Sequence, residues 1–188
     1  MAPFNPPQKP AGSELLAKAA NVKLLVFDVD GVLTDGGLYY GPSGEGLKRF
    51  DVKDGHAVVM ARLVGLPAAV LTARRSSIVE IRAKELGLVA VMQGRKDKAL
   101  GLRELLDQLG TPAEACAYMG DDVNDLGALQ IAGLPSCPAD AAAEVRQQSL
   151  FVAQQPGGRG AVRELIELCL KASNRWNGAL DLMRGGQI

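Results

Sequence analysis

Short, unbroken apolar runs recur along the chain, and they constrain its fold more than any other sequence feature. The clear runs cover residues 23–27, 68–71, 89–92 and 115–119, and two weaker ones cover 134–137 and 150–152. A strand that is apolar at every position suits a parallel sheet covered by helices on both faces, whereas a half-exposed strand would alternate apolar and polar residues. The runs therefore predict a buried, mostly parallel sheet.

Segments with helical spacing lie between these runs. We expect helices over residues 13–20, 57–64, 76–86, 98–109 and 162–170. In the third of these, Ile78, Ile81 and Leu86 are expected to face the core. Alternating strands and helices favour right-handed βαβ units, so the predicted fold class is α/β: a three-layer, Rossmann-like α/β/α sandwich.

The segment 36–52 interrupts this alternation. Two short stretches with aromatic residues flank a Pro-Ser-Gly-Glu-Gly turn, which predicts a β-hairpin inserted after the first strand. We expect no large cap domain. The predicted organisation is an arm and short helix over 1–20, a main domain over 21–174 with the hairpin as a flap, and a mobile tail over 175–188.

Composition narrows the classes of function. Lys plus Arg and Asp plus Glu both total 21, so the chain lacks the basic excess that favours nucleic-acid binding. No apolar run has the length of a membrane span, and the opening residues lack the pattern of a secretory signal. Cys116, Cys137 and Cys169 are widely spaced and predict reduced core thiols, and a single histidine, His56, argues against a His-rich zinc site. We expect a cytoplasmic protein without nucleic-acid or membrane partners.

Polar side chains follow the ends of the apolar runs. Asp28 and Asp30 come directly after the first run, Thr72 closes the second, Lys98 lies beyond the third, and Asp121 follows the fourth. The carboxyl ends of parallel strands meet at one edge of the sheet, where ligands bind in open α/β folds. We therefore expect three acids, a hydroxyl group and one cation to share a crevice.

These residues belong to four motifs that resemble those of the haloacid dehalogenase superfamily of phosphotransferases. The motifs are D-x-D-G-x-x-T at 28–34, a strand-ending Thr at 72, a lone Lys before a helix at 98, and G-D-D-x-x-D at 120–125. Any one of them alone is weak, but all four occur in the family's order.

The resemblance implies a role for each residue. Asp28 is expected to attack phosphorus and form an aspartyl phosphate, and Asp30 to protonate the leaving alkoxide and then to activate water. Mg²⁺ is expected to be bound by Asp28, Asp121 and the backbone carbonyl group of Asp30. Thr72 and Lys98 are expected to hold phosphate oxygens during catalysis.

Electrostatics explains why such a set of residues is needed. An attacking carboxylate and a phosphate monoester are both anionic, and two unit charges at ~4 Å repel each other by roughly 4 kcal/mol at an effective dielectric constant near ~20. A divalent metal and a cationic side chain must offset this repulsion. Mg²⁺ suits the task because it prefers oxygen ligands and takes only a few of them from the protein.

Further segments resemble the phosphatases of 3-deoxy-D-manno-octulosonate (KDO) 8-phosphate over nearly all of residues 20–188. The segments are 33–36, 48–55, 78–87, 93–98 and 157–164. This narrower resemblance implies an acidic sugar phosphate as substrate, with contacts from Thr34, Arg74 and Lys98. It also implies a homotetramer in which the hairpin of one subunit covers the site of a neighbour and the C-terminal tail reaches a neighbour's pocket.

One position departs from the family pattern, and several assignments stay open. Ala73 stands where the second motif usually has glycine, which adds a methyl group near the phosphate but leaves the N–H available. Asp122 and Asp125 are expected either to support the site or to cap a helix. For the whole chain, the alternatives are a phosphatase for a nine-carbon acid sugar 9-phosphate and a non-catalytic scaffold that keeps the fold.

Overall fold

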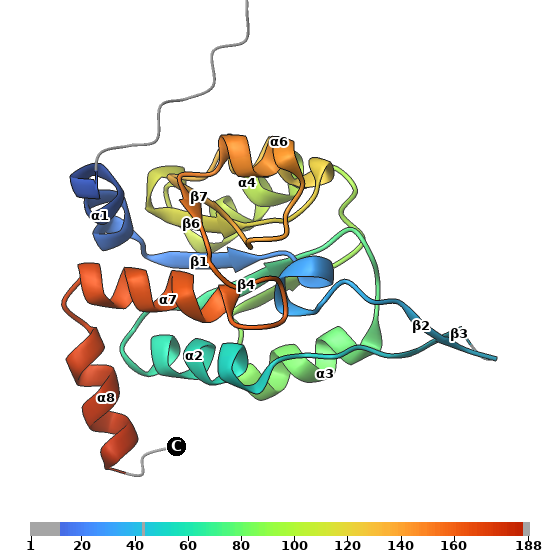
Figure 1. Ribbon diagram of the computed structural model, residues 1–188, viewed down its shortest axis with the longest axis horizontal. Helices are drawn as coiled ribbons and strands as arrows, with labels where there is room; N and C mark the ends of the chain where they lie inside the picture. The colour runs from blue at the N-terminus through green and yellow to red at the C-terminus, as the bar shows by residue number, and fades with distance from the viewer. Residues whose placement is uncertain (1–11, 43, 186–188) are drawn as a thin grey trace, which may run out of the picture.

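The computed structural model describes residues 12–42 and 44–185, and its centre is a parallel sheet (Figure 1). The six strands follow the order β5-β4-β1-β6-β7-β8, and all neighbouring strands are parallel. Successive strands are added first on one side of β1 and then on the other. The point where the strand order reverses therefore lies beside β1, which is where open α/β sheets bind ligands.

Each predicted apolar run forms a strand of this sheet. The strands are β1 (Leu24–Phe27), β4 (Ala68–Leu71), β5 (Ala90–Met92), β6 (Cys116–Met119), β7 (Leu134–Cys137) and β8 (Phe151–Val152). The four strands β4, β1, β6 and β7 are buried at every residue. Burial on both faces explains why the runs are unbroken, and the predicted α/β sandwich is confirmed.

Helices cover both faces of the sheet, as Figure 1 shows. The core on one face includes residues of α1 (Gly12–Asn21), α2 (Val52–Leu63), α3 (Ser77–Leu86), α7 (Ala161–Ala172) and α8 (Trp176–Arg184). The core on the other face includes residues of α4 (Lys98–Leu109), α5 (Leu126–Leu129) and α6 (Ala143–Gln148). Three single turns complete the fold: η1 (Val29–Leu33), η2 (Ala113–Ala115) and η3 (Val123–Asp125).

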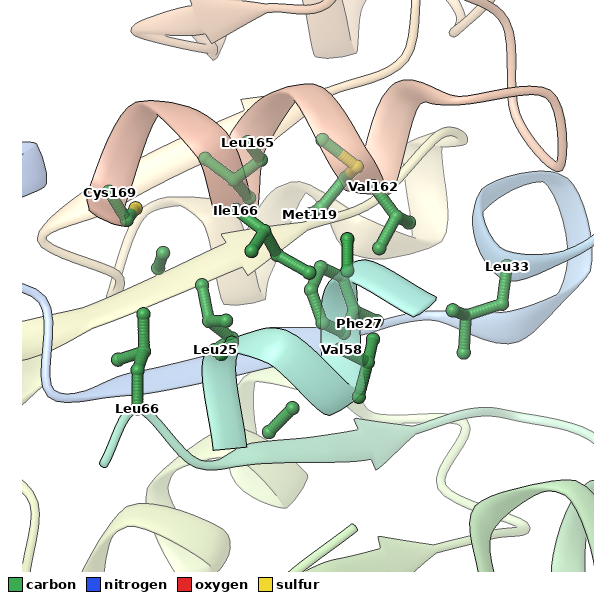
Figure 2. Close-up of a cluster of buried hydrophobic side chains, with 14 of the residues drawn as sticks. Leu25, Phe27, Leu33, Val58, Leu66, Met119, Val162, Leu165, Ile166 and Cys169 are labelled. Carbon is green, nitrogen blue, oxygen red and sulfur yellow. The ribbon is translucent and has the colours of Figure 1, made fainter. Parts of the chain in front are cut away.

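The central strand β1 supplies side chains to both halves of the core, because successive residues of a strand point to opposite faces. Leu25 and Phe27 pack in the cluster between the sheet and the helices α2 and α7, which Figure 2 shows. Leu24 and Val26 pack on the opposite face. Each fully buried side chain of this size contributes about 1.5–3 kcal/mol, so the end of β1, where Asp28 follows, is firmly held.

Helix α2 begins earlier than predicted, at Val52 rather than at Ala57. The side chain of Asp51 accepts a hydrogen bond from the N–H of Lys53 at 2.7 Å. This contact caps the helix at a position that apolar spacing alone did not reveal.

Helix α3 has the predicted extent but a different buried face. Ile81, which was expected to face the core, is 62% exposed, and Ile78 is only half-buried. Val79 and Ala83 are buried instead, and Leu86 is buried as predicted. The segment carries two apolar stripes, and only packing against the sheet selected the second.

The expectation of a mobile tail from residue 175 is wrong for Trp176–Arg184, which form helix α8. Trp176, Leu180 and Met183 pack against the core, and Ala179 is fully buried. Their spacing places them on one face of a helix, and burying that face holds the segment in place. Residues 186–188 of the predicted tail and residues 1–11 of the predicted arm lie outside the described residues.

The predicted hairpin consists of β2 (Tyr39–Gly41) and β3 (Gly44–Leu47), which pair antiparallel. In Figure 1 it extends away from the sheet. Several of its apolar side chains are exposed, including Leu38, Tyr40 and Leu47. Within residues 12–42 and 44–185, no helix combines the length and apolarity that crossing a membrane requires.

Candidate active site

The carboxylate of Asp28 lies where β1 ends, and both of its oxygens are held. The backbone N–H of Asp28 donates to the carbonyl oxygen of Met119 at 3.0 Å, which continues the pairing of β1 with β6. Oδ1 accepts a hydrogen bond from the N–H of Val29 at 2.7 Å, and Oδ2 forms an ion pair with Nζ of Lys98 at 2.8 Å. The side chain is only 7% exposed. These contacts fix the orientation of a nearly buried acid.

After Asp28 the chain turns at Gly31, whose φ of 88° is in the region that favours glycine. A Cβ atom at this position would lie 2.0 Å from Oδ2 of Asp121. Glycine is therefore required both by the backbone conformation and by the close approach of the Asp121 carboxylate. This approach brings the first and fourth motifs together, as predicted.

Thr34 supports the loop from behind and does not line the cavity described below. Its hydroxyl group donates to the carbonyl oxygen of Val29 at 3.2 Å and accepts from the N–H groups of Gly31 at 3.4 Å and Gly36 at 3.3 Å. The side chain is buried. The structure thus gives Thr34 a different place from the expected substrate contact, because its hydrogen bonds close the loop on itself.

Lys98 is buried in a network of polar side chains. Its Nζ contacts Oδ1 of Asp125 at 2.8 Å and the hydroxyl oxygen of Tyr118 at 3.4 Å, besides Asp28. The Tyr118 hydroxyl group donates to Asp125 at 2.6 Å. A buried cation is costly unless it is paired, and here two carboxylates pair with it. The prediction placed Lys98 at this site but did not include Tyr118, because its position within an apolar strand gives no signal of a polar role.

The second oxygen of Asp125 faces the fourth motif. Oδ2 accepts the backbone N–H groups of Asp121 at 3.0 Å and of Asp122 at 3.3 Å. Asp122 itself is exposed and caps η3 through the N–H of Val123 at 2.7 Å. Asp125 thus supports the site and also caps η3, while Asp122 caps the same turn and lines the cavity described below.

Three carboxylates could hold a metal ion. Oxygens of Asp28, Asp121 and Asp125 lie within 4.8 Å of one another. Asp125 is fully buried and does not line the cavity described below, and its oxygens accept hydrogen bonds from Lys98, Tyr118 and backbone N–H groups. The donor set that remains is Asp28 and Asp121, which are hard oxygen ligands of the kind that Mg²⁺ prefers. The site therefore fits the predicted cation, while the third predicted ligand, the backbone carbonyl group of Asp30, stays a prediction.

The close packing of these acids shifts their pKa values. Burial raises the pKa of Asp28 to about 6, although the Lys98 ammonium opposes the shift. Burial, reinforced by Asp125 and Asp28, raises the pKa of Asp121 to about 8. The nearby carboxylates outweigh the effect of burial on Lys98, so its pKa is raised and it stays charged. One buried cation among three acids leaves negative charge that a divalent cation would offset.

A cavity of about 170 Å³ opens at this end of the sheet. Its lining includes Asp28, Asp30, Thr72, Arg74, Asp121 and Asn124. Ala73, which stands where the family usually has glycine, also lines it. Of the predicted residues, Lys98 reaches the cavity only through Asp28, because its own side chain is 0% exposed.

Asp30 lies on the hairpin side of the cavity. Its Oδ1 forms an ion pair with Nζ of Lys48, and its Oδ2 lies 3.6 Å from Nε of Arg74. Arg74 in turn donates to the hydroxyl group of Tyr40 on β2 at 3.1 Å. The prediction placed Asp30 and Arg74 together but did not identify Lys48, although this lysine lies within the segment 48–55 that carried the family resemblance.

The glycine-rich segment 157–164 packs against the loop that follows Asp28. A Cβ atom at Gly157 would lie 1.8 Å from the carbonyl oxygen of Gly31, and the N–H of Gly158 donates to the carbonyl oxygen of Val32 at 2.9 Å. The buried carboxylate of Asp54 in α2 accepts the N–H groups of Gly160 at 3.0 Å and Arg163 at 2.8 Å. This segment therefore supports the site structurally, which explains its glycines.

Comparison with known proteins agrees with this geometry. The family of haloacid dehalogenase-like hydrolases matches residues 68–165. The 3-deoxy-D-manno-octulosonate 8-phosphate phosphatase KdsC of Escherichia coli K12 is 38% identical over 179 residues, which cover 95% of this chain and 93% of that protein. The KdsC protein of Yersinia pestis is 39% identical over 173 residues, which cover 92% of each chain.

Solved structures are similar over most of the chain. The 3-deoxy-D-manno-octulosonate 8-phosphate phosphatase of Moraxella catarrhalis, in complex with a magnesium ion, a phosphate ion and KDO, has 38% sequence identity and a TM-score of 0.89, covering 92% of this chain and 99% of that one. The cobalt-bound phosphatase of Haemophilus influenzae has 38% identity and a TM-score of 0.82, covering 84% and 92%. By sequence and by fold, the chain belongs to the haloacid dehalogenase-like hydrolase family.

Proposed function

We propose that the protein is a magnesium-dependent phosphatase that hydrolyses KDO 8-phosphate to KDO and inorganic phosphate, a step in the synthesis of lipopolysaccharide precursors. The observation that carries this proposal is the Asp28 carboxylate, which is held at both oxygens at the edge of a small cavity and lies beside Asp121. Relatives that cover nearly the whole chain are named for this activity.

Asp28 acts as the nucleophile. One of its oxygens attacks phosphorus in line with the leaving oxygen, so that an aspartyl phosphate forms as the ester bond breaks. The N–H of Val29 and the ammonium group of Lys98 hold the carboxylate in one orientation, which lowers the entropic cost of reaching the reactive geometry. Water then hydrolyses the aspartyl phosphate and regenerates the carboxylate.

Asp30 serves as the general acid and base. It lines the same cavity as Asp28, and its side chain is more exposed than that of Asp28, at 20% against 7%. The acid gives its proton to the departing alkoxide, and the resulting carboxylate takes a proton from the attacking water. A positioned group of this kind contributes about 10²–10⁴-fold to the rate.

Mg²⁺ is the cofactor, held by carboxylate oxygens of Asp28 and Asp121 and by the backbone carbonyl group of Asp30. When bound, it supplies positive charge that offsets the repulsion between the carboxylate and the phosphate dianion. Thr72, which is buried at the end of β4 and lines the cavity, contacts phosphate oxygens. Lys98 acts on the phosphate by way of Asp28.

Arg74 binds the anionic part of the sugar. Its side chain is 41% exposed and Arg74 lines the cavity, so it is accessible to a ligand. A planar guanidinium group can bind a carboxylate through two parallel hydrogen bonds, which favours an acid sugar over a neutral one.

Two further features complete the proposal: a homotetramer and a cytoplasmic location. The exposed apolar residues of the hairpin, such as Tyr40 and Leu47, support an interface with a neighbouring subunit. Cys116, Cys137 and Cys169 are buried free thiols, which suits a reducing compartment. Light scattering of the purified protein tests the subunit count.

A substrate panel tests the function. Phosphate release is measured from KDO 8-phosphate and from nine-carbon acid sugar 9-phosphates, with Mg²⁺ and with a chelator. We expect the highest kcat/KM for KDO 8-phosphate and no turnover without a divalent metal. A higher kcat/KM for a nine-carbon acid sugar 9-phosphate would identify that compound as the substrate in place of KDO 8-phosphate. No turnover of any ester at any metal concentration would favour a non-catalytic scaffold.

A further inference from the structure

Lys48 is a buried cation at the base of the hairpin. It follows the last residue of β3, its side chain is 1% exposed, and its Nζ forms an ion pair with Oδ1 of Asp30. Removing an ammonium group from water is costly unless a carboxylate compensates it. The ion pair with Asp30 therefore allows Lys48 to be buried, and the same ion pair orients the carboxylate of Asp30.

The backbone around Lys48 is fixed against the catalytic loop. Phe50 forms a β-bridge with Thr34, and Arg49 donates to the carbonyl oxygen of Gly158 at 2.8 Å. Arg49 also lies 3.6 Å from the carboxylate of Asp35. Since the segments on both sides of the ion pair are tied together, the ammonium group approaches Asp30 from a defined direction.

The two oxygens of Asp30 have different surroundings. Oδ1 is engaged by the buried ammonium group of Lys48, whereas Oδ2 faces Arg74 at the cavity that Asp30 lines. The backbone at Asp30 is extended, with φ of −77° and ψ of 115°. Rotation of the Asp30 side chain therefore decides which of its two carboxyl oxygens meets a ligand. Fixing Oδ1 turns Oδ2 toward the cavity.

We propose that Lys48 is a positioning residue that orients the carboxyl group of Asp30 for proton transfer to the leaving group. The inference rests on the proposed phosphatase function. As the bond between Asp28 and phosphorus forms and the ester bond breaks, the proton on Oδ2 of Asp30 passes to the departing oxygen. Lys48 exchanges no proton in this step and holds the other oxygen in place.

Leaving-group dependence tests this role. Phenyl phosphate and p-nitrophenyl phosphate have similar size, but phenolate is the stronger base and needs protonation, whereas nitrophenolate leaves readily without it. Lys48→Met keeps the buried alkyl stem and removes the charge. We expect kcat/KM to fall about 10- to 100-fold for phenyl phosphate and for KDO 8-phosphate, but less than about 3-fold for p-nitrophenyl phosphate.

A matched control is Lys53→Met, which removes an exposed lysine from the first turn of α2 and is expected to leave both rates unchanged. Turnover of p-nitrophenyl phosphate by Lys48→Met reports that the variant is folded, and Lys48→Gln is a second variant with a polar side chain. An equal loss on both aryl phosphates in both variants, or no loss on phenyl phosphate, overturns the proposal. A wild-type protein that hydrolyses none of the esters contradicts the phosphatase function instead.

Discussion

Two lysine–carboxylate pairs flank the cavity, and they differ in how they are built. The pair of Asp28 and Lys98 is enclosed by the sheet and α4, with 7% and 0% of the side chains exposed, and it is joined by Asp125. The pair of Asp30 and Lys48 lies between the loop and the hairpin, with 20% and 1% exposed, and Asp30 also faces Arg74. The first pair belongs to the scaffold of the fold, while the second depends on an appended element.

This difference matches the tasks that we propose for the two acids. A nucleophile must be held in one orientation, which a buried and fully hydrogen-bonded network provides. A group that gives a proton to a substrate and then takes one from water needs access to both. The hairpin supplies a neighbour for Asp30 without burying it completely.

The largest expected effect concerns Asp28, the proposed nucleophile. Asp28→Asn should lower kcat by about 10⁴-fold or more, because an amide cannot form the aspartyl phosphate. Mg²⁺ binding should weaken but persist, since Asp121 remains. Steady-state phosphate release and calorimetric titration measure both quantities. A kcat equal to that of the wild type would refute nucleophilic catalysis by this residue.

The next effect tests the enclosed pair. Lys98→Met leaves the buried carboxylates of Asp28 and Asp125 without their cation, so the free energy of unfolding should fall by about 3 kcal/mol. Lys84→Met on the exposed side of α3 is the control and should change it by less than about 0.5 kcal/mol. Urea unfolding measures both values. Equal stability of the two variants would mean that the ion pairs of Lys98 contribute nothing to the free energy of unfolding.

A moderate effect is expected on how the stability of the protein depends on pH, with and without Mg²⁺. The pKa values of Asp28 and Asp121 are raised in the folded protein, to about 6 and about 8, above the ordinary value of 3.8 for an aspartic acid. The metal-free folded state thus binds more protons than the unfolded chain, and its stability should decline as pH rises from about 4 to about 8. Mg²⁺ should reverse this decline, most strongly at pH 8, because it binds the deprotonated acids.

Thermal unfolding from pH 5 to pH 8, with Mg²⁺ and with a chelator, measures this effect. A stabilisation by Mg²⁺ that is as large at pH 5 as at pH 8 would show that these carboxyl groups are not the ones that bind it.

The smallest expected effect compares two hydroxyl groups. Tyr118→Phe removes a buried donor to Asp125 and should cost about 2 kcal/mol of stability, whereas Tyr40→Phe removes an exposed contact with Arg74 and should cost less than about 0.5 kcal/mol. Chemical denaturation of the two variants decides the comparison. Similar losses of stability in the two variants would mean that the buried hydroxyl group of Tyr118 contributes no more to stability than the exposed one of Tyr40.

Much of the fold was predictable because burial leaves a mark on composition. The runs that became β1, β4 and β6 are apolar throughout because both faces of these strands are buried, although the strand β5 is equally apolar while only partly buried. The face of α3 was mispredicted, because Ile81 and Val79 are both apolar and only the position of the sheet decides between them. The segment Trp176–Arg184 was mispredicted too, since its apolar face gains stability only by packing against α2 and α7.

For the site, residues that follow strands were the predictable part. Asp28, Asp30, Thr72 and Asp121 line one cavity because the carboxyl ends of parallel strands share one edge. Lys48 could not be found this way, since it enters from a hairpin whose direction no local pattern reports. Thr34 shows the converse. It belongs to the first motif, but its hydroxyl group makes its hydrogen bonds within the loop that follows Asp28.

The amino-acid sequence alone determined the buried parallel sheet and the identity of the acids at its edge, because both depend on local pattern and on chain order. Only the tertiary structure decided which oxygens remain available to a ligand. Asp125 is fully buried and paired with Lys98 and Tyr118, while Asp28 and Asp121 line the cavity. That distinction arises from hydrogen bonds between segments far apart in the chain, and a residue's type does not reveal how many partners will meet it.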